Sequence, residues 1–277
     1  MADIWHEKVE VRFGSVDRSD RLTLGSIFNF FQEAAISHAS DLGVGRNVLE
    51  RKGQAWILLR FSLFVQRRPV CGEIVRVSTW PRSCEKLLAL RDYEIRDEQD
   101  NPVVRGRGGW LVFDVEKRRP VRTEVFVEPL PVNDGIDALS GIQGSRSPTS
   151  LGQRENLAKK TERTALYSDI DYYGHANNAR YIQWIQDATD TDILTASDQV
   201  RLDINYLHEV KPGETVELWT AALPENVSRE QVLSPADFPS PLGQGFVYEG
   251  RRPGTDQALF RAELFTNLKG NLTVPTK

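Results

Sequence analysis

The sequence predicts an α+β protein built from two copies of one unit, in each of which a helix packs on an antiparallel β-sheet. Two segments of 20 residues align with each other without a gap, and several short strand-like runs follow each of them. The chain of 277 residues is long enough for two domains of about 130 residues each. Its 40% hydrophobic and 27% charged residues are typical of a folded globular protein.

The duplication is indicated by two pairs of matching segments in the same order. Residues 15–34 align with residues 169–188 at an offset of 154 residues, which places Asp17 on Asp171. Residues 70–77 then resemble residues 210–217, and Gly72 corresponds to Gly213 at an offset of 141 residues. Two matches in the same order indicate a repeat. The expected organisation is an N-terminal repeat over residues 1–130, a linker over 131–158 and a C-terminal repeat over 159–277.

The two halves show the same order of local patterns. An opening strand is expected at residues 8–13 and again at 161–167, and a helix follows each. The first helix ends near Gly43 as a C-cap, and Asn177 or Asn178 is the candidate N-cap of the second. The apolar positions at helical spacing are Ile27, Phe30, Phe31, Ala34 and Ala35, and then Tyr181, Ile182, Ile185 and Ala188. Further strands are expected at 56–65, 74–80, 87–95, 103–113, 202–207, 215–221, 245–248 and 259–265. A long loop is expected at 225–242.

Composition narrows the function classes. The formal net charge of -4 and the pI of about 5.7 argue against a nucleic-acid-binding protein. No signal-peptide pattern and no apolar run of roughly 20 residues occurs, so we expect a cytoplasmic protein without a membrane span. Cys71 and Cys84 are too few for a disulfide framework, and we expect two buried or half-buried thiols. The four histidines lack metal-ligand spacing, so neither a metal nor another cofactor is expected.

One motif carries a family resemblance. Residues 169–184 read D-I-D-Y-Y-G-H-A-N-N-A-R-Y-I-Q-W, which resembles the acyl-ACP thioesterase signature D-x-D-x-N-x-H-x-N-N-x-x-Y-x-x-W. Residues 110–122 and 206–214 are also similar to segments of this family, so the resemblance spans nearly the whole chain. It implies a double hot-dog fold, with a long helix wrapped by an antiparallel sheet in each repeat. It further implies hydrolysis of fatty acyl thioesters on acyl carrier protein (ACP), within fatty acid biosynthesis.

The resemblance assigns catalytic positions in the C-terminal repeat. Asp171, His175 and Glu209 match the family's catalytic residues, whereas Tyr173 stands where the family has a catalytic Asn. Either the Tyr173 phenol substitutes in part or one of the neighbouring asparagines, Asn177 or Asn178, contributes; the replacement is also expected to lower activity. Some members carry a cysteine beside the glutamate, but this chain has a valine there, so a cysteine nucleophile is not expected.

The chemistry of thioester hydrolysis requires the same residue types. A carboxylate in a poorly solvated site has a raised pKa and can activate water as a general base, and Glu209 is the candidate. Backbone N–H groups at the start of a helix can stabilise an oxyanion, which is the role expected for Gly174 and His175. Glycine at position 174 also permits close approach of the backbone to the substrate.

The two repeats differ at these positions. At the two offsets, His175 corresponds to Arg21 and Glu209 to Arg68, so the N-terminal repeat lacks the acid–base residues. We therefore expect one active site, formed by the C-terminal repeat, while the N-terminal repeat supplies the acyl pocket that the family implies. The candidate substrate-binding residues are Ile27, Phe30, Phe31, Trp56 and Leu58.

The expected partner is an acidic acyl carrier protein, which a basic patch would help to dock. Candidate patches are Arg67-Arg68, residues 117–119 and Lys159-Lys160. The alternatives are an acyl-CoA thioesterase, a dehydratase of the same fold and a non-catalytic protein that binds acyl carriers. The Asp-x-x-x-His-x-Asn-Asn spacing argues against the dehydratase. A homodimer is an open option, and the preferred acyl chain is not specified by these motifs.

Overall fold

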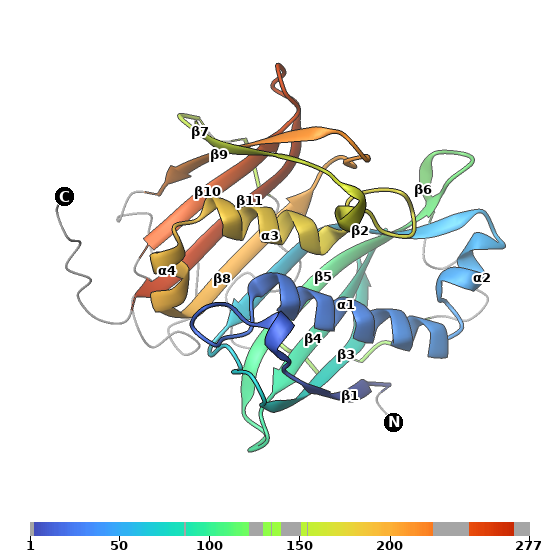
Figure 1. Ribbon diagram of the computed structural model, residues 1–277. Helices are drawn as coiled ribbons and strands as arrows, with labels where there is room; N and C mark the ends of the chain where they lie inside the picture. The colour runs from blue at the N-terminus through green and yellow to red at the C-terminus, as the bar shows by residue number, and fades with distance from the viewer. Residues whose placement is uncertain are drawn as a thin grey trace.

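The computed structural model describes residues 3–85, 87–121, 130–133, 135–139, 151–153, 155–223 and 244–268. Within these residues one 11-stranded antiparallel sheet runs in the order β1-β3-β4-β5-β2-β8-β11-β10-β9-β7, with β6 paired to β5. Helices α1 (Leu24–Asp41) and α3 (Asn178–Ala188) lie side by side across the same face of this sheet (Figure 1). The predicted α+β class, with one long helix and one run of antiparallel strands in each half, is confirmed.

Apart from β6, which was not predicted, the strands lie close to their predicted positions. Those of the first half are β1 (Trp5–Glu10), β2 (Gln54–Val65), β3 (Ile74–Glu85), β4 (Leu88–Arg96), β5 (Pro102–Asp114) and β6 (Arg119–Val121). Those of the second half are β7 (Ala158–Thr164), β8 (Ser197–Tyr206), β9 (Thr215–Ala222), β10 (Gln244–Arg251) and β11 (Ala258–Leu268). The two opening strands begin and end three residues earlier than predicted. Each is followed by a short 3-10 helix, η1 (Phe13–Ser15) or η3 (Tyr167–Asp169), which takes the chain away from the sheet edge.

The same local backbone structures occur in both repeats, at positions separated by 154 and 141 residues. An isolated β-bridge joins Val16 to Leu22 in the first repeat and Ile170 to Ala176 in the second. Gly72 and Gly213 have φ angles of 82° and 81°. Their N–H groups donate 2.8 Å hydrogen bonds to the carbonyl oxygens of residues 11 and 165, respectively. The predicted repeat is therefore present as a repeated three-dimensional structure.

The helices differ between the repeats. The first helix has Leu42 as its C-cap, and Gly43 follows with a φ of 69°, so the predicted C-cap glycine lies one residue beyond the cap. The second helix begins at the predicted N-cap Asn177, but it ends at Ala188 after 11 residues, against 18 in the first. The side chain of Asp190 then accepts a hydrogen bond from the Asp192 N–H and starts the separate helix α4 (Thr191–Ala196). A short helix, α2 (Arg46–Glu50), also follows α1.

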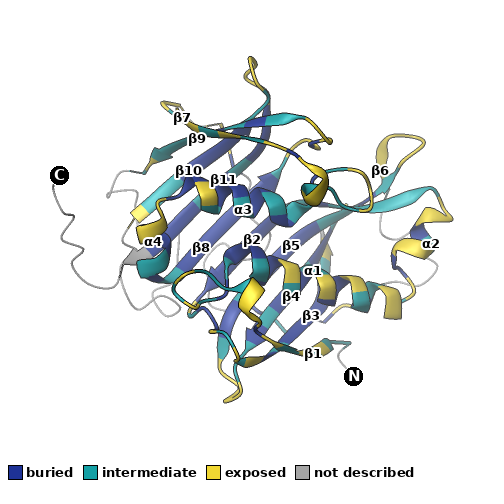
Figure 2. Ribbon diagram, viewed as in Figure 1, coloured by how far each residue is buried: buried dark blue, intermediate teal, exposed yellow. Residues whose placement is uncertain are grey.

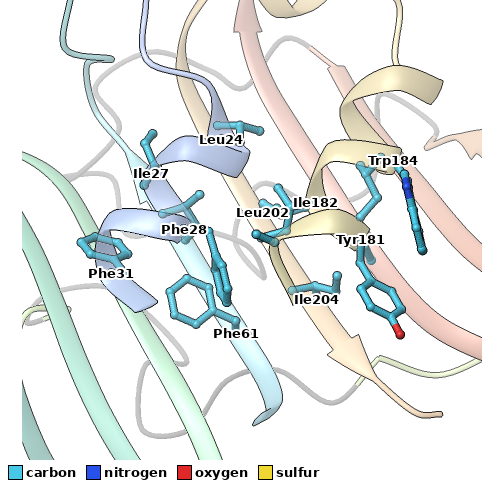
Figure 3. Close-up of a cluster of buried hydrophobic side chains, with 14 of the residues drawn as sticks. Leu24, Ile27, Phe28, Phe31, Phe61, Tyr181, Ile182, Trp184, Leu202 and Ile204 are labelled. Carbon is cyan, nitrogen blue, oxygen red and sulfur yellow. The ribbon is translucent and has the colours of Figure 1, made fainter. Parts of the chain in front are cut away.

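The core lies between the helices and the sheet. Figure 3 shows the side chains of α1 and β2 meeting those of α3 and β8 in one continuous cluster. The two halves are joined by antiparallel pairing of β2 with β8, where Leu63 lies opposite Leu202 and both are fully buried. The strands at the centre of the sheet are mostly buried, whereas the outer sides of the helices are exposed (Figure 2). None of the described helices is long and apolar enough to cross a membrane.

The described parts of the predicted linker are held by polar contacts with the first and second halves. The Asn133 amide donates to the Pro81 carbonyl oxygen at 2.8 Å, and Asp137 accepts from Arg107 at 2.6 Å. The Leu151 N–H donates to the Asn205 side chain at 2.8 Å. The predicted loop at 225–242 lies outside the described residues.

The cysteine prediction is half right. Cys71 is half-buried, as expected, but Cys84 is exposed at the end of β3. Cys84 lies between the predicted strands 74–80 and 87–95, but β3 continues to residue 85, and exposure at a strand end depends on what packs over it.

Candidate active site

Three of the predicted catalytic residues, Asp171, Tyr173 and His175, lie on one tight turn before α3, here called the catalytic turn (residues 171–175) after that predicted role. The Asp171 N–H donates to the His175 carbonyl oxygen at 2.8 Å, and the Gly174 N–H donates to the Asp171 carbonyl oxygen at 3.1 Å. The Asp171 carboxylate accepts from the Tyr173 N–H at 2.9 Å. Gly174 has a φ of 81°, which glycine adopts without strain. Asp171 thus organises the backbone that carries His175 and Tyr173.

His175 contacts Glu209 from the connection after β8. Nε2 of His175 lies 2.7 Å from Oε2 of Glu209, the length of a charge-assisted hydrogen bond. The backbone supports this contact, because the Ala176 N–H donates to the Val210 carbonyl oxygen at 2.8 Å. The sequence motif and the later Glu209 segment are therefore brought together as predicted.

The expected poor solvation of Glu209 is wrong. Its side chain is 61% exposed, and that of His175 is 31% exposed. Glu209 lies in the loop that follows β8, where its carboxylate is open to solvent. Desolvation of this carboxylate therefore requires a bound substrate or carrier that covers it.

Tyr173 lies at the rim of the catalytic turn, 45% exposed. Its ring packs edge-on against Tyr172, with 5.5 Å between the ring centroids. Burial raises the pKa of the Tyr173 phenol, and the nearby Glu50 carboxylate raises it further. The phenol is therefore protonated at neutral pH and acts as a hydrogen-bond donor, which is the property that an Asn amide would also offer.

The predicted oxyanion donors need one correction. The Gly174 N–H is already used in the bond to the Asp171 carbonyl oxygen, so it is not available to a substrate. Helix α3 begins at Asn178, which leaves Gly174 and His175 in the preceding turn rather than at the helix start. The His175 N–H donates to no backbone carbonyl among the described residues, so this donor is retained as a candidate.

Asn177 serves as a helix cap. Its side-chain oxygen accepts a 2.9 Å hydrogen bond from the Ala179 N–H at the start of α3. This bond uses the acceptor atom of the amide and fixes the side chain against the helix. The arrangement favours a capping role over the catalytic role considered from the sequence.

The predicted substrate-binding residues belong mainly to the core of the first repeat. Ile27, Phe31 and Leu58 are buried, while Phe30 packs against the same cluster half-buried. Figure 3 shows Ile27 and Phe31 among the side chains between α1 and the sheet. The half-buried Trp56 donates its indole N–H to the Val44 carbonyl oxygen at 3.0 Å. Their role as the wall of an acyl pocket stays a prediction.

The first repeat keeps the same turn with different chemistry. The Ser19 N–H donates to the Asp17 carboxylate at 2.8 Å, as the Tyr173 N–H does to Asp171. Arg68, at the position of Glu209, is 3% exposed and contacts Asp17 at 2.6 Å. Its guanidinium also donates to the carbonyl oxygen of Leu194 in α4 at 2.8 Å. An ion pair packed against α4 thus replaces the acid–base pair, as the asymmetry of the repeats predicts.

Of the basic patches expected to dock a carrier, residues 117–119 and Lys160 are exposed, but the other members are buried or paired. Arg68 is buried against Asp17 and contributes nothing to the surface, contrary to expectation. Arg67 pairs with Glu73, and Lys159 pairs with Glu162 and Glu217. Arg68 and Lys159 have partners 51 and 58 residues away in the sequence, Asp17 and Glu217, which a run of like charges does not reveal.

Two residues near the catalytic turn were not predicted. The Arg46 guanidinium of α2 lies over the ring of Tyr172, 3.9 Å from its centroid. This contact places a side chain of the first repeat against the catalytic turn of the second. A five-residue helix has too short a periodicity to be predicted, so the sequence offers no signal for it.

Comparison with known proteins supports the interpretation of this geometry. Models of the acyl-ACP thioesterase N-terminal and C-terminal domains match residues 2–128 and 152–236. The chain belongs to the acyl-ACP thioesterase family. The matched segments include the catalytic turn and Glu209, so the pair described above lies within the family's C-terminal domain.

Several relatives of this acyl-ACP thioesterase family member are known by sequence. The chain is 24% identical over 237 residues to acyl-[acyl-carrier-protein] hydrolase FATB2, chloroplastic, of Cuphea viscosissima, covering 80% of this chain and 56% of that protein. It is also 24% identical over 243 residues to oleoyl-acyl carrier protein thioesterase 2, chloroplastic, of Arabidopsis thaliana, covering 80% and 64%. The chain thus matches between about half and two thirds of the length of these plant relatives.

Solved structures of the family share the fold over almost the whole chain. A putative oleoyl thioesterase from Lactobacillus plantarum superposes with a TM-score of 0.79 at 21% identity and covers 98% of both chains. An acyl-ACP thioesterase from Bacteroides thetaiotaomicron gives a TM-score of 0.73 at 22% identity, covering 96% of this chain and 98% of that one. The predicted double hot-dog fold is confirmed by this likeness.

Proposed function

We propose that this chain hydrolyses fatty acyl thioesters carried on acyl carrier protein, releasing a free fatty acid and the carrier thiol, in fatty acid biosynthesis. Family membership supports a thioesterase, and the names of the plant relatives support an acyl-carrier substrate. The observation that carries the proposal is the 2.7 Å contact between His175 and Glu209, which the first repeat replaces with an ion pair. One such pair in two otherwise matching turns favours one active site per chain.

In this proposal Glu209 is the general base. Its Oε2 accepts a hydrogen bond from His175, which leaves Oε1 to take a proton from the attacking water. The water oxygen adds to the thioester carbonyl carbon and forms a tetrahedral intermediate. When the carbon–sulfur bond breaks, the proton held by the Glu209–His175 pair passes to the leaving thiolate. Atoms and charge therefore balance without a cofactor.

The oxyanion of the intermediate requires hydrogen-bond donors. The His175 N–H and the Tyr173 phenol are the two groups of the catalytic turn that we propose for this role. The raised pKa of Tyr173 keeps its proton in place at neutral pH. A phenol at the family's Asn position is therefore compatible with activity, although its reach differs from that of an amide.

The remaining assignments follow from the fold of the family. We propose that the first repeat accommodates the acyl chain near Ile27, Phe30, Phe31, Trp56 and Leu58. The cytoplasmic location, the homodimer and the domain boundaries given above stay predictions.

The test is the release of free thiol from a panel of acyl-ACPs and acyl-CoAs. Glu209→Gln removes the base but keeps the shape of the side chain, so kcat is expected to fall by about 100- to 10,000-fold. Glu98→Gln, on the exposed turn between β4 and β5, is the matched control and is expected to retain wild-type activity.

The outcomes separate the competing functions. Hydrolysis of acyl-ACP that is lost in Glu209→Gln supports the proposal, whereas a preference for acyl-CoA assigns the substrate to the free coenzyme. No hydrolysis of any thioester by the wild type, with retained binding of acyl-ACP, identifies a non-catalytic carrier-binding protein. Tyr173 at the Asn position is the specific observation that favours this second candidate.

A further inference from the structure

Helix α2 is firmly attached to the first repeat. Leu49 of this helix is fully buried, and the carbonyl oxygen of Val44, just before it, accepts from the Trp56 indole of β2 at 3.0 Å. A Cβ atom on Gly45 would lie only 2.8 Å from the Cα of Ser40, so the backbone that leads into α2 packs closely on the end of α1. The position of α2 is thus set by the core of the first repeat.

Two exposed residues of α2, Arg46 and Glu50, lie near the catalytic turn of the second repeat. Arg46 lies over the Tyr172 ring at 3.9 Å, and Tyr172 packs edge-on against Tyr173 at 5.5 Å. Glu50 pairs with Arg46 at 3.8 Å within the helix, and its charge also acts on the Tyr173 phenol. A chain of contacts therefore runs from the first repeat through Arg46 and Tyr172 to the turn that carries His175.

The same arrangement occurs on the other side of the molecule. At the offset of 154 residues, Tyr172 corresponds to Arg18, which pairs with Asp192 of α4. Helix α4 follows α3 as α2 follows α1, so each short helix contacts the Asp-centred turn of the opposite repeat. Around the first-repeat turn, buried Arg68 and half-buried Arg21 add further bonds to α4 and β8. At the catalytic turn, the Arg46–Tyr172 contact is the corresponding link.

We propose that Arg46 and Tyr172 are positioning residues for the catalytic turn, by which the first repeat holds His175 in register with Glu209. This proposal rests on the proposed thioesterase activity and adds the contribution of the first repeat to it. A cation over an aromatic ring has a defined geometry, and Tyr172 is one residue from Asp171, which organises the turn. Loss of the contact lets the turn shift without removing any group that touches the substrate.

The expected effect is on kcat rather than on KM. Arg46→Ala and Tyr172→Leu are each expected to lower kcat about fivefold, the equivalent of one exposed cation–π contact, with an unchanged KM. Arg46→Lys and Tyr172→Phe keep a cation and a ring, so both are expected to retain most of the activity. Arg46 and Tyr172 are exposed, so these variants are expected to fold, which circular dichroism checks.

The decisive measurement is a double-mutant cycle in kcat on the acyl thioester that the wild type hydrolyses best. If the two residues act through one contact, the Arg46→Ala/Tyr172→Leu double variant loses no more activity than either single variant. Arg18→Ala, at the equivalent position of the first-repeat turn, is the control and is expected to leave kcat unchanged.

Two results overturn the proposal while leaving the thioesterase function intact. Additive losses in the cycle contradict a shared contact, and a raised KM with unchanged kcat assigns Arg46 to carrier binding instead. A wild type that hydrolyses no thioester overturns the proposed function, and the positioning role with it.

Discussion

Single residues decide which of two matching turns can be catalytic. Asp17 and Asp171 hold their turns with the same backbone hydrogen bonds, but the side chains facing them differ. Arg68 is buried against Asp17, whereas Glu209 is exposed beside His175. An arginine stays protonated near neutral pH and is a poor proton acceptor, so we expect the first-repeat turn to contribute to structure rather than to catalysis.

The first prediction concerns the ion pair of the first repeat. Asp17→Asn leaves the Arg68 guanidinium buried without its counter-charge, so the free energy of unfolding is expected to fall by about 3 kcal/mol. Asp192→Asn, which breaks the exposed pair with Arg18, is expected to cost less than about 1 kcal/mol. Denaturant unfolding measures both; equal costs would contradict the assigned burial of Arg68.

A second residue-scale prediction concerns His38, which is buried on α1 beside β4. Burial lowers the pKa of His38, and Arg91 lowers it further, whereas Asp3 and Asp41 oppose the shift. Arg91 donates to Nδ1 at 3.0 Å, so the neutral ring carries its proton on Nε2, which faces Asp3 at 3.2 Å.

The lowered pKa of His38 makes stability depend on pH. Below the unfolded pKa of about 6.5, the unfolded chain binds a proton at His38 that the folded chain does not. The contribution of neutral His38 to the free energy of unfolding is therefore fully present above that pH. It is lost as the pH drops toward the folded pKa. His38→Gln is expected to reduce this slope between pH 7.5 and 5.5 in denaturant titrations. His208→Gln is the control, and an unchanged slope in His38→Gln would refute the assignment.

At the scale of elements, α1 and α3 begin in the same way but end differently. Thr23 and Asn177, at the offset of 154 residues, cap α1 and α3 with side-chain oxygens. The C-terminal ends differ: α3 stops at Thr189, whose backbone is extended (φ -86°, ψ 145°) and whose hydroxyl bonds to the Ile185 carbonyl oxygen and to Tyr248. The early stop frees residues 191–196 to form α4 over the first-repeat turn.

The element-scale prediction separates capping from catalysis at Asn177. Asn177→Ala is expected to lower the free energy of unfolding by about 1 kcal/mol, and Thr23→Ala by a similar amount. Because the cap is not a catalytic group, kcat of folded Asn177→Ala is expected to change by less than about threefold. Thiol release at a temperature well below unfolding measures this; a loss of about 100-fold would restore a catalytic role.

At the scale of the whole molecule, the pairing of β2 with β8 makes one sheet from two repeats. Leu63 and Leu202 lie opposite each other at this junction, with core side chains of both helices above them. No described strand separates the two halves, so the hydrophobic core is continuous across the junction. The repeats therefore stabilise each other.

The whole-molecule prediction is cooperative unfolding. Leu63→Ala creates a cavity at the junction and is expected to cost about 2–5 kcal/mol, with tryptophan fluorescence and far-ultraviolet circular dichroism following one transition. Leu87→Ala, at an exposed position, is expected to change stability by less than about 0.5 kcal/mol. Separate transitions, with only the first half destabilised, would contradict a shared core.

Much of this architecture could be predicted from patterns among residues that are close together in the sequence. Strand alternation, helical spacing and turn residues predict the main strands and both long helices, because each signal depends on neighbours in the chain. The gapless offset predicts that the two turns have the same backbone, as the β-bridges at residues 16 and 170 demonstrate. The cap at Asn177 is predicted for the same reason, since a cap bonds within three residues of itself.

The α+β class, the duplication, the family and the residues that distinguish one turn from the other could all be predicted from the amino-acid sequence. The tertiary structure alone decided that Arg68 is buried, that Glu209 is exposed and that Gly174 lacks a free N–H group. It also decided the joining of β2 to β8 and the contact of Arg46 with Tyr172. These features depend on groups far apart in the chain, whose burial and partners arise only when the two repeats pack together.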